Sequence, residues 1–325
     1  TQFNWTYDNV APTMTIASTT SGVTDGSTTN DASIALIFTS SKATTNFIAT
    51  NITVSGGTIG TLDGSGTTYT TTFTPSGSGA KTIDVSGSAF TDAAGNSNLA
   101  ATQFNWTYDN VSPSMTITAK KPDNITPVLN DLTTNDPNLL LTFTSSEPTL
   151  NFNENSIITV TNGEITNFTK SSDTIYTATF TPSGNGNCSI TVGAGVYTDA
   201  AGNNNSSSNQ FLWTFDTTEP TMVITAKNSS NQDVSSGSIT NDSNLTLSFT
   251  FNENIQNGSF TSNDISGTNG TISNFLQSSN RLYTAIFTPD NVGPCSIEVT
   301  TGAYIDVAGN VNTDTPQFQW SFDNV

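Results

Sequence analysis

The sequence predicts an all-β protein, a tandem array of three similar β-sandwich domains arranged end to end. A stretch at residues 90–115, FTDAAGNSNLAATQFNWTYDNVSPSM, recurs at residues 197–222 and, shortened, at residues 304–325. The tryptophans recur at intervals of 101, 107 and 107 residues, at Trp5, Trp106, Trp213 and Trp320. This period suits one complete small domain per repeat and is too long for a short solenoid unit. Apolar residues alternate with polar ones, and no segment has a convincing helical period.

Composition limits the function classes. The net charge is −19, from 26 acidic and seven basic residues, and histidine is absent. Nucleic-acid binding needs a basic stripe, which this chain cannot build, and the same sign argument excludes an anionic membrane surface. Without histidine, the commonest general base and the usual zinc and iron ligand are missing. A hard, oxygen-seeking cation stays compatible with the composition.

The first half of each repeat has four recurring features. A proline leaves the linker, at Pro12, Pro113 and Pro220. A short Met-x-Ile strand follows, at residues 14–16, 115–117 and 222–224. A variable polar loop then leads to a Thr-Asn-Asp motif, at residues 29–31, 134–136 and 240–242. A strand of alternating apolar residues comes next, at residues 34–38, 139–143 and 245–249.

The second half of each repeat reads as hairpins. Turn signals of Gly-Gly or Asn-Gly stand at residues 56–57, 162–163 and 269–270. A Tyr-x-Thr/Ala-x-Phe strand ends at Thr-Pro, and an Ile-x-Val strand leads into an Asp-x-Ala-Gly-Asn turn. The repeat ends on an aromatic strand, which in the first repeat carries Phe104, Trp106 and Tyr108. About seven short strands per hundred residues predict an Ig-like β-sandwich.

The aromatic strands are predicted to form the sandwich core, since their aromatic residues share one face. A carbohydrate-stacking platform is the alternative, but it would not need to lie on the terminal strand of every repeat. We also predict that Cys188 and Cys295 are small core residues. They occupy the same repeat position, so they lie in different domains, far beyond disulfide reach.

The predicted domains are residues 10–109, 110–216 and 217–325, with residues 1–9 as the last strand of a preceding repeat. Linkers of only a few residues make the domains abut, so we expect a stiff rod. A lone strand is an exposed edge that something must cover. It belongs to a preceding domain or is donated to a neighbouring subunit, and the identity of residues 1–10 with residues 102–111 favours the first. We expect the chain to be part of something longer.

Three stretches of the second repeat have a recognisable pattern: Ser145-Ser146-Glu147, the strand from Tyr176 to Pro182, and Thr-Asp-Ala-Ala-Gly-Asn at residues 198–203. On these residues the repeats resemble the bacterial Ig-like domains of very large cell-surface adhesins and of some marine viral and microbial surface proteins, and the resemblance covers all three repeats. It implies an extender function, with calcium bound near the domain junctions.

Acidic residues that recur in each repeat are candidate calcium ligands. Ig-like topology brings the linker, the loop after the second strand and the turn before the last strand to one end of a domain. We therefore expect one cluster of Asp109, Glu147 and Asp199, and a second of Asp216, Glu253 and Asp306. Three or four carboxylates with carbonyls and water suit calcium, and without a cation they would repel one another.

The Thr-Asn-Asp motif belongs at the opposite end, so Asp136 is expected to approach the junction that holds Asp216 and Glu253. The first repeat departs from the pattern because Lys42 stands where the others carry Glu, which makes Asp8, Asp31 and Asp92 weaker candidates. An ammonium there replaces the cation or weakens the site. The competing interpretation of both motifs is turn chemistry alone.

The predicted function is a non-catalytic extracellular stalk, extender or filament segment, at a cell or virion surface. Its partners would be neighbouring repeats of the same long chain or other copies in a fibre, with no nucleic acid and no membrane insertion. An adhesin module that binds glycan or protein is the alternative. A hydrolase with paired carboxylates is disfavoured, because the acids recur in every repeat and form no singular pair.

Overall fold

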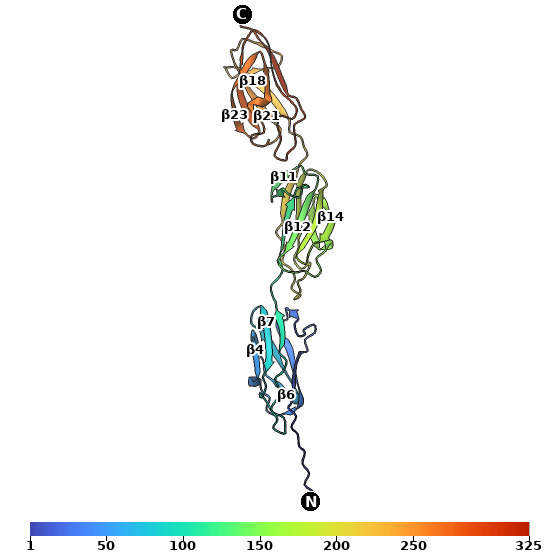
Figure 1. Ribbon diagram of the computed structural model, residues 1–325. Helices are drawn as coiled ribbons and strands as arrows, with labels where there is room; N and C mark the ends of the chain where they lie inside the picture. Colours follow the sequence, from blue (N-terminus) through green and yellow to red (C-terminus); the bar gives the residue numbers. More distant parts are fainter. Residues whose placement is uncertain (325) are drawn as a thin grey trace.

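The computed structural model describes residues 1–324. It contains three β-sandwich domains that follow one another along a single long axis, with the two termini at opposite ends (Figure 1). Each domain is Ig-like and has two packed sheets, which confirms the predicted fold class. Nowhere in residues 1–324 is there a helix with the length and hydropathy needed to cross a membrane.

Domain 1 contains strands β1 to β8. Their bounds are β1 Met14–Ser18, β2 Thr28–Thr29, β3 Ile34–Thr44, β4 Ile52–Ser55, β5 Gly57–Ile59, β6 Asp63–Pro75, β7 Gly79–Val85 and β8 Phe104–Tyr108, with a 3-10 helix η1 at Ala49–Asn51. One sheet has the order β1-β3-β6-β5 and the other β2-β8-β7-β4. All pairs are antiparallel except β2 and β8, which run parallel.

Domain 2 contains β9 to β17. The bounds are β9 Met115–Lys120, β10 Pro127–Val128, β11 Leu132–Thr134, β12 Leu139–Ser145, β13 Ile157–Thr161, β14 Gly163–Lys170, β15 Ile175–Pro182, β16 Gly186–Val192 and β17 Phe211–Phe215, with η2 at Glu154–Ser156. The sheets have the orders β10-β9-β12-β15-β14 and β11-β17-β16-β13.

Domain 3 repeats this plan with β18 to β26. The bounds are β18 Met222–Lys227, β19 Asp233–Val234, β20 Ile239–Thr240, β21 Leu245–Phe251, β22 Ile265–Thr268, β23 Gly270–Ser279, β24 Leu282–Pro289, β25 Gly293–Val299 and β26 Gln317–Phe322, with η3 at Ser262–Asp264. Its sheets have the orders β19-β18-β21-β24-β23 and β20-β26-β25-β22. Among residues 1–324 the domains have eight, nine and nine strands, slightly more than the expected seven, because strands of two or three residues extend the sheet edges.

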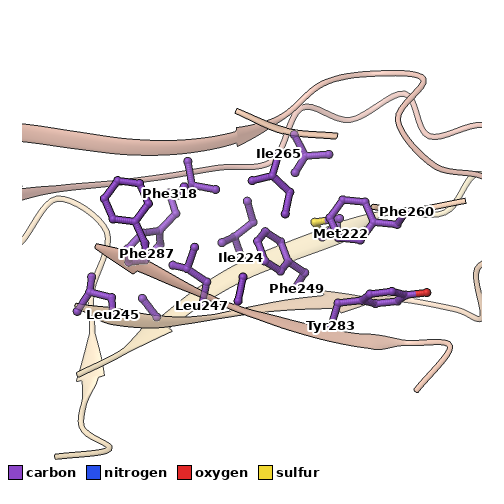
Figure 2. Packing of buried hydrophobic residues seen from close by; sticks show 14 of the residues in the cluster. Met222, Ile224, Leu245, Leu247, Phe249, Phe260, Ile265, Tyr283, Phe287 and Phe318 are labelled. Atoms are coloured by element: carbon purple, nitrogen blue, oxygen red, sulfur yellow. The ribbon is translucent and has the colours of Figure 1, made fainter. Parts of the chain in front are cut away.

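Alternation along the strands builds one core per domain. In β21 the side chains of Leu245, Leu247 and Phe249 point inward and are fully buried, with more polar positions between them. Figure 2 shows these side chains beside Phe287 of the neighbouring strand β24 and facing Phe318 of the opposite sheet. Burying one such side chain contributes about 1.5–3 kcal/mol. Low hydrophobic content is therefore sufficient, because nearly every inward position is apolar.

The terminal aromatic strands are core, as predicted. Trp106, Trp213 and Trp320 are each at most 3% exposed. Each packs edge-on against a phenylalanine of the opposite sheet, and in domain 2 the ring centroids of Trp213 and Phe180 are 4.5 Å apart. Cys188 and Cys295 are buried and unbridged, also as predicted.

The tight turn before β14 shows why glycine follows asparagine there. Asn162 adopts a φ of 54°. A Cβ on Gly163 would lie 2.3 Å from the ring of Phe180, so no side chain fits. Gly270 has the same relation to Phe287, with 2.4 Å to the ring.

Residues 1–9 carry the sequence of a terminal strand but have no sheet beside them among the described residues. No strand is formed there, and Phe3, Trp5 and Tyr7 are 87%, 72% and 72% exposed. Their equivalents in β8 are buried against β7 and β2. The sequence FNWTY therefore forms a strand in β8, where a sheet receives it, and none at residues 3–7.

Candidate metal centres at the domain joints

Consecutive domains are connected by two short joints. The first, joint 1–2, is residues 109–114, between β8 and β9, and the second, joint 2–3, is residues 216–221, between β17 and β18. The backbone N–H of Asp109 donates to Thr29 O at 3.0 Å, and that of Asp216 donates to Thr134 O at 3.1 Å. Each joint therefore begins as a continuation of the last strand and stays bonded to the domain that it leaves.

Three carboxylates meet where each joint enters the next domain. Each residue of the first group offers an oxygen within 4.8 Å of the others, and the second group has the same spacing. The groups are Asp109, Glu147 and Asp199 (the domain 2 cluster) and Asp216, Glu253 and Asp306 (the domain 3 cluster). The linker, the segment after the second long strand and the turn before the last strand supply one residue each.

The turn aspartate divides its two oxygens between two tasks. Oδ1 of Asp199 accepts the backbone N–H groups of Ala201 and Asn203, both at 2.9 Å, which closes the Asp-x-Ala-Gly-Asn turn. Oδ2 accepts the Asn203 side-chain amide at 2.9 Å, and in the equivalent Asp92 it is Oδ2 that contacts Lys42. Turn chemistry and ligation are thus compatible in one residue, and Asp199 is only 2% exposed.

The electrostatics of the clusters raise the pKa of the glutamate. For Glu147, burial raises the pKa, and the charges of Asp109 and Asp199 add to the effect. For Glu253, burial again raises the pKa, followed by the charges of Asp306 and Asp216, while Asn252 and Arg281 oppose it. Protonation or a cation would relieve this repulsion.

Domain 1 places a cation from its own chain in the equivalent position. Lys42 Nζ lies 2.6 Å from both carboxylate oxygens of Asp8 and 3.1 Å from Oδ2 of Asp92, and it also donates to the carbonyl of Val10. Lys42 contacts Oδ2 of Asp92, whereas Oδ1 accepts the backbone N–H groups of Ala94 and Asn96 in the turn. We call this arrangement the ammonium site.

The pKa values of the two aspartates at the ammonium site are lowered, whereas those of the cluster glutamates are raised. The hydrogen bond from Lys42 lowers the pKa of Asp8. The Asn96 side chain, the Asn96 backbone and Lys42 lower the pKa of Asp92 to about 2. Both carboxylates are therefore held in the charged form.

The donor set suits a hard cation. A carbonyl and two aspartates surround the Lys42 ammonium, and each cluster has a glutamate at the repeat position of Lys42. Val111 and Thr218 occupy the sequence position of Val10, and the N–H of each donates to Oδ1 of its linker aspartate, at 3.0 and 2.9 Å, as the N–H of Val10 does in domain 1. Carboxylate and carbonyl oxygens are the ligands that calcium takes in proteins.

The Thr-Asn-Asp motif contacts the joints through a different residue from the one expected. Asp136 does not join the domain 3 cluster, because its Oδ2 lies 3.0 Å from Lys121 Nζ and accepts the Thr134 hydroxyl. Asn135 instead contacts domain 3, where its N–H donates to Ala308 O at 3.1 Å and its amide donates to Asn310 Oδ1 at 3.0 Å. Asp31 likewise accepts the hydroxyl of Thr29 at 2.6 Å.

The same asparagine contact occurs at joint 1–2, and sequence reasoning missed it. The N–H of Asn30 donates to Ala201 O at 3.2 Å, and its amide donates to Asn203 Oδ1 at 3.2 Å. The signal available in the sequence was that asparagine recurs between the threonine and the aspartate in every repeat. The joint contact was predicted for the aspartate, because aspartate is the metal ligand of the three.

Comparison with known proteins gives one family over nearly the whole chain. The profile described as a bacterial Ig-like domain matches residues 8–108, 109–213 and 216–320. No curated protein sequence matches the chain.

The solved structures that match the chain include those of two bacterial proteins. Invasin, described as a bacterial integrin-binding protein, is 18% identical over 97% of this chain and 60% of its own, with a TM-score of 0.41. InvD of Yersinia pseudotuberculosis is 14% identical over 96% of this chain and 98% of its own, with a TM-score of 0.39. The chain thus spans 60% of the length of the invasin structure.

Proposed function

This chain belongs to the bacterial Ig-like domain family, and from that membership we propose that it is a non-catalytic, extracellular structural segment, a stalk or filament that holds another domain away from a surface. The recurrent acids support a structural use, since they come once per domain at the joints and form no singular catalytic pair. An acidic surface rich in Thr and Asn keeps such a rod soluble and resists nonspecific association.

The observation that carries the proposal is the construction of the joints. Each joint is bonded to the domain behind it through Thr29 or Thr134, and to the domain ahead of it through an asparagine amide. Asn203 donates to Asp109 O at 3.0 Å, and Asn310 donates to Asp216 O at 2.9 Å. A linker held on both sides transmits force and direction, which is what a projecting stalk needs.

Calcium at the two clusters is the second part of the proposal. A divalent cation would replace the mutual repulsion of three carboxylates with attraction, and it would tie the linker aspartate to the domain ahead. The residues that would hold it are Asp109, Glu147 and Asp199 at one joint, and Asp216, Glu253 and Asp306 at the other. The Lys42 ammonium supports this assignment, because it is a positive charge in the homologous position of the same chain.

Melting and small-angle scattering of the whole chain test the proposal. A ligand at 100 times its Kd stabilises a site by about 2.7 kcal/mol, so we expect calcium to raise the Tm of domains 2 and 3 by roughly 10–20 °C over chelator. Scattering in chelator should show a broader range of shapes. Identical melting and scattering curves in the two conditions would contradict calcium stiffening.

A ligand-binding adhesin module is the second candidate function. One observation favours it: the loop between β9 and β11 exposes Ile125 and Leu129, which are 79% and 67% exposed. The equivalent loops of domains 1 and 3 have other sequences. A screen against glycans and host surface proteins, with the variant Ile125→Ser/Leu129→Ser as the control, would detect binding that depends on this loop, and a stalk without adhesive function predicts none.

A further inference from the structure

The Thr-Asn-Asp motifs form an interaction surface at the C-terminal end of each domain, separate from the carboxylate clusters. In each motif the aspartate side chain accepts the threonine hydroxyl, and the aspartate N–H donates back to it, at 3.1 Å in domains 1 and 3 and 3.3 Å in domain 2. This closed pair fixes the backbone and leaves the middle asparagine side chain directed away from its own domain. Asn30 and Asn135 then make two hydrogen bonds each to the next domain.

The receiving surface is the Asp-x-Ala-Gly-Asn turn of that next domain. Its alanine carbonyl and the side-chain oxygen of its asparagine are the two acceptors, in Ala201 and Asn203 at joint 1–2. The backbone conformation favours glycine inside this turn, because Gly202 has a φ of +92°, and the Asn30 side chain lies beside it. The turn is thus shaped to present both acceptors on a smooth surface.

The two contacts fix how one domain is oriented on the next. A linker alone leaves rotation about its axis, whereas two hydrogen bonds beside the linker oppose twisting and bending. The receiving asparagine also donates to the linker carbonyl and to the turn aspartate, so that a single amide connects three parts of the joint. For Asn310 these acceptors are Asp216 O at 2.9 Å and Asp306 Oδ2 at 2.8 Å.

We infer that the Thr-Asn-Asp motif is a docking element for the Asp-x-Ala-Gly-Asn turn of a following bacterial Ig-like domain, and that Asn30 and Asn135 set the angle at joints 1–2 and 2–3. Asn241 is the third copy of the element. Asn241 is exposed at the C-terminal end of domain 3, and among residues 1–324 no other domain adjoins that end to receive the contact. Its fitting partner is a further domain with the same turn.

Distances between spin labels test the inference in the intact chain. Labels attached at Thr166→Cys and Ser273→Cys, both exposed, report on joint 2–3, and the native thiols are buried. We expect Asn135→Ala to lose the single narrow distance peak in favour of a broad distribution. In residues 1–325, Asn241→Ala is the matched control, since it removes the same residue of the same motif away from joint 2–3, and it should leave the peak unchanged.

Two further measurements separate docking from folding and from cation binding. Asn135→Ala should leave hydrogen exchange within the domains 2 and 3 cores and the calcium stoichiometry as in the wild type, because neither the cores nor the carboxylates contain Asn135. In a chain in which residues 11–109 follow residue 325, Asn241→Ala should broaden the new joint. An unchanged peak in Asn135→Ala, or equal broadening in the control, would overturn the inference.

Discussion

The N-terminal ends of domains 1 and 2 have the same frame and opposite electrostatics. Both bring a linker aspartate and a turn aspartate together and bond a turn asparagine to the linker carbonyl, through Asn96 in domain 1 and Asn203 in domain 2. The difference is one side chain, Lys42 in the first and Glu147 in the second. With lysine, two carboxylates share one ammonium, and with glutamate three carboxylates face one another with no positive side chain among them.

This comparison supports the proposal that the frame accepts a cation whose source varies. In domain 1 the positive charge is covalently attached, as the ammonium of Lys42. In domains 2 and 3 the proposed cation would be a dissolved ion. The chain would then contain one site with a permanent positive charge, at Lys42, and two sites whose positive charge depends on a bound ion.

Placing lysine at both clusters should have the largest effect. In chelator, Glu147→Lys/Glu253→Lys should raise the Tm of domains 2 and 3, on the order of 5–10 °C, because an ammonium replaces a third carboxylate. Calcium should then no longer shift the melting curve. Differential scanning calorimetry with and without calcium measures both effects, and Glu147→Gln/Glu253→Gln is the control for charge removal alone.

The reverse exchange should make domain 1 ion-dependent. Lys42→Glu removes the contacts to Asp8 and Asp92 and builds a third carboxylate cluster. In chelator we expect domain 1 to melt earlier than in the wild type, and calcium to restore it. Hydrogen exchange followed by domain locates the change, and protection that stays low in calcium would argue against equivalent frames.

Acidification in chelator should act on the two kinds of site differently. The pKa of Glu147 and of Glu253 is raised, so the repulsion present at neutral pH is relieved as pH falls through the raised values toward 4.5. Domains 2 and 3 should therefore gain stability between pH 7 and pH 5, by less than calcium provides.

Domain 1 should not change over that pH range. The pKa of Asp8 and of Asp92 is lowered from 3.8, so their stabilisation is complete above 3.8 and is lost only below it. Melting curves from pH 7 to pH 5 in chelator measure the contrast. Parallel behaviour of all three domains would contradict it.

The smallest effect is expected at Asp136. Asp136→Asn removes its ion pair with Lys121, and partly exposed pairs contribute only about 0–1 kcal/mol. The stoichiometry of bound calcium should stay as in the wild type, since this carboxylate lies outside the cluster at joint 2–3. A lost calcium ion in isothermal titration would place Asp136 among the ligands.

Much of the fold was predictable because the chain repeats its own pattern. Period-two alternation, as in Phe104, Trp106 and Tyr108, identified inward positions, and the fold class is confirmed. Ig-like topology also indicated which acidic residues would share one end of a domain. The metal itself stays a prediction.

The details at the joints were not predictable from residue types. Asp136 and Asn135 are neighbours in sequence, and only the folded backbone decides which of them faces the next domain. Residues 1–9 have a clear strand pattern, yet a strand also needs a partner, which periodicity does not reveal. The sequence presents turn closure and metal binding as competing interpretations of Asp199. In the structure its two oxygens have different contacts, so the two interpretations do not exclude each other.

The most direct test of the account is the number of calcium ions that three forms of the intact chain bind, measured by isothermal titration calorimetry. If the Lys42 ammonium stands where calcium stands in the other domains, the wild type should bind two ions, Lys42→Glu three, and Glu147→Lys/Glu253→Lys none. The same number in all three forms would contradict the account.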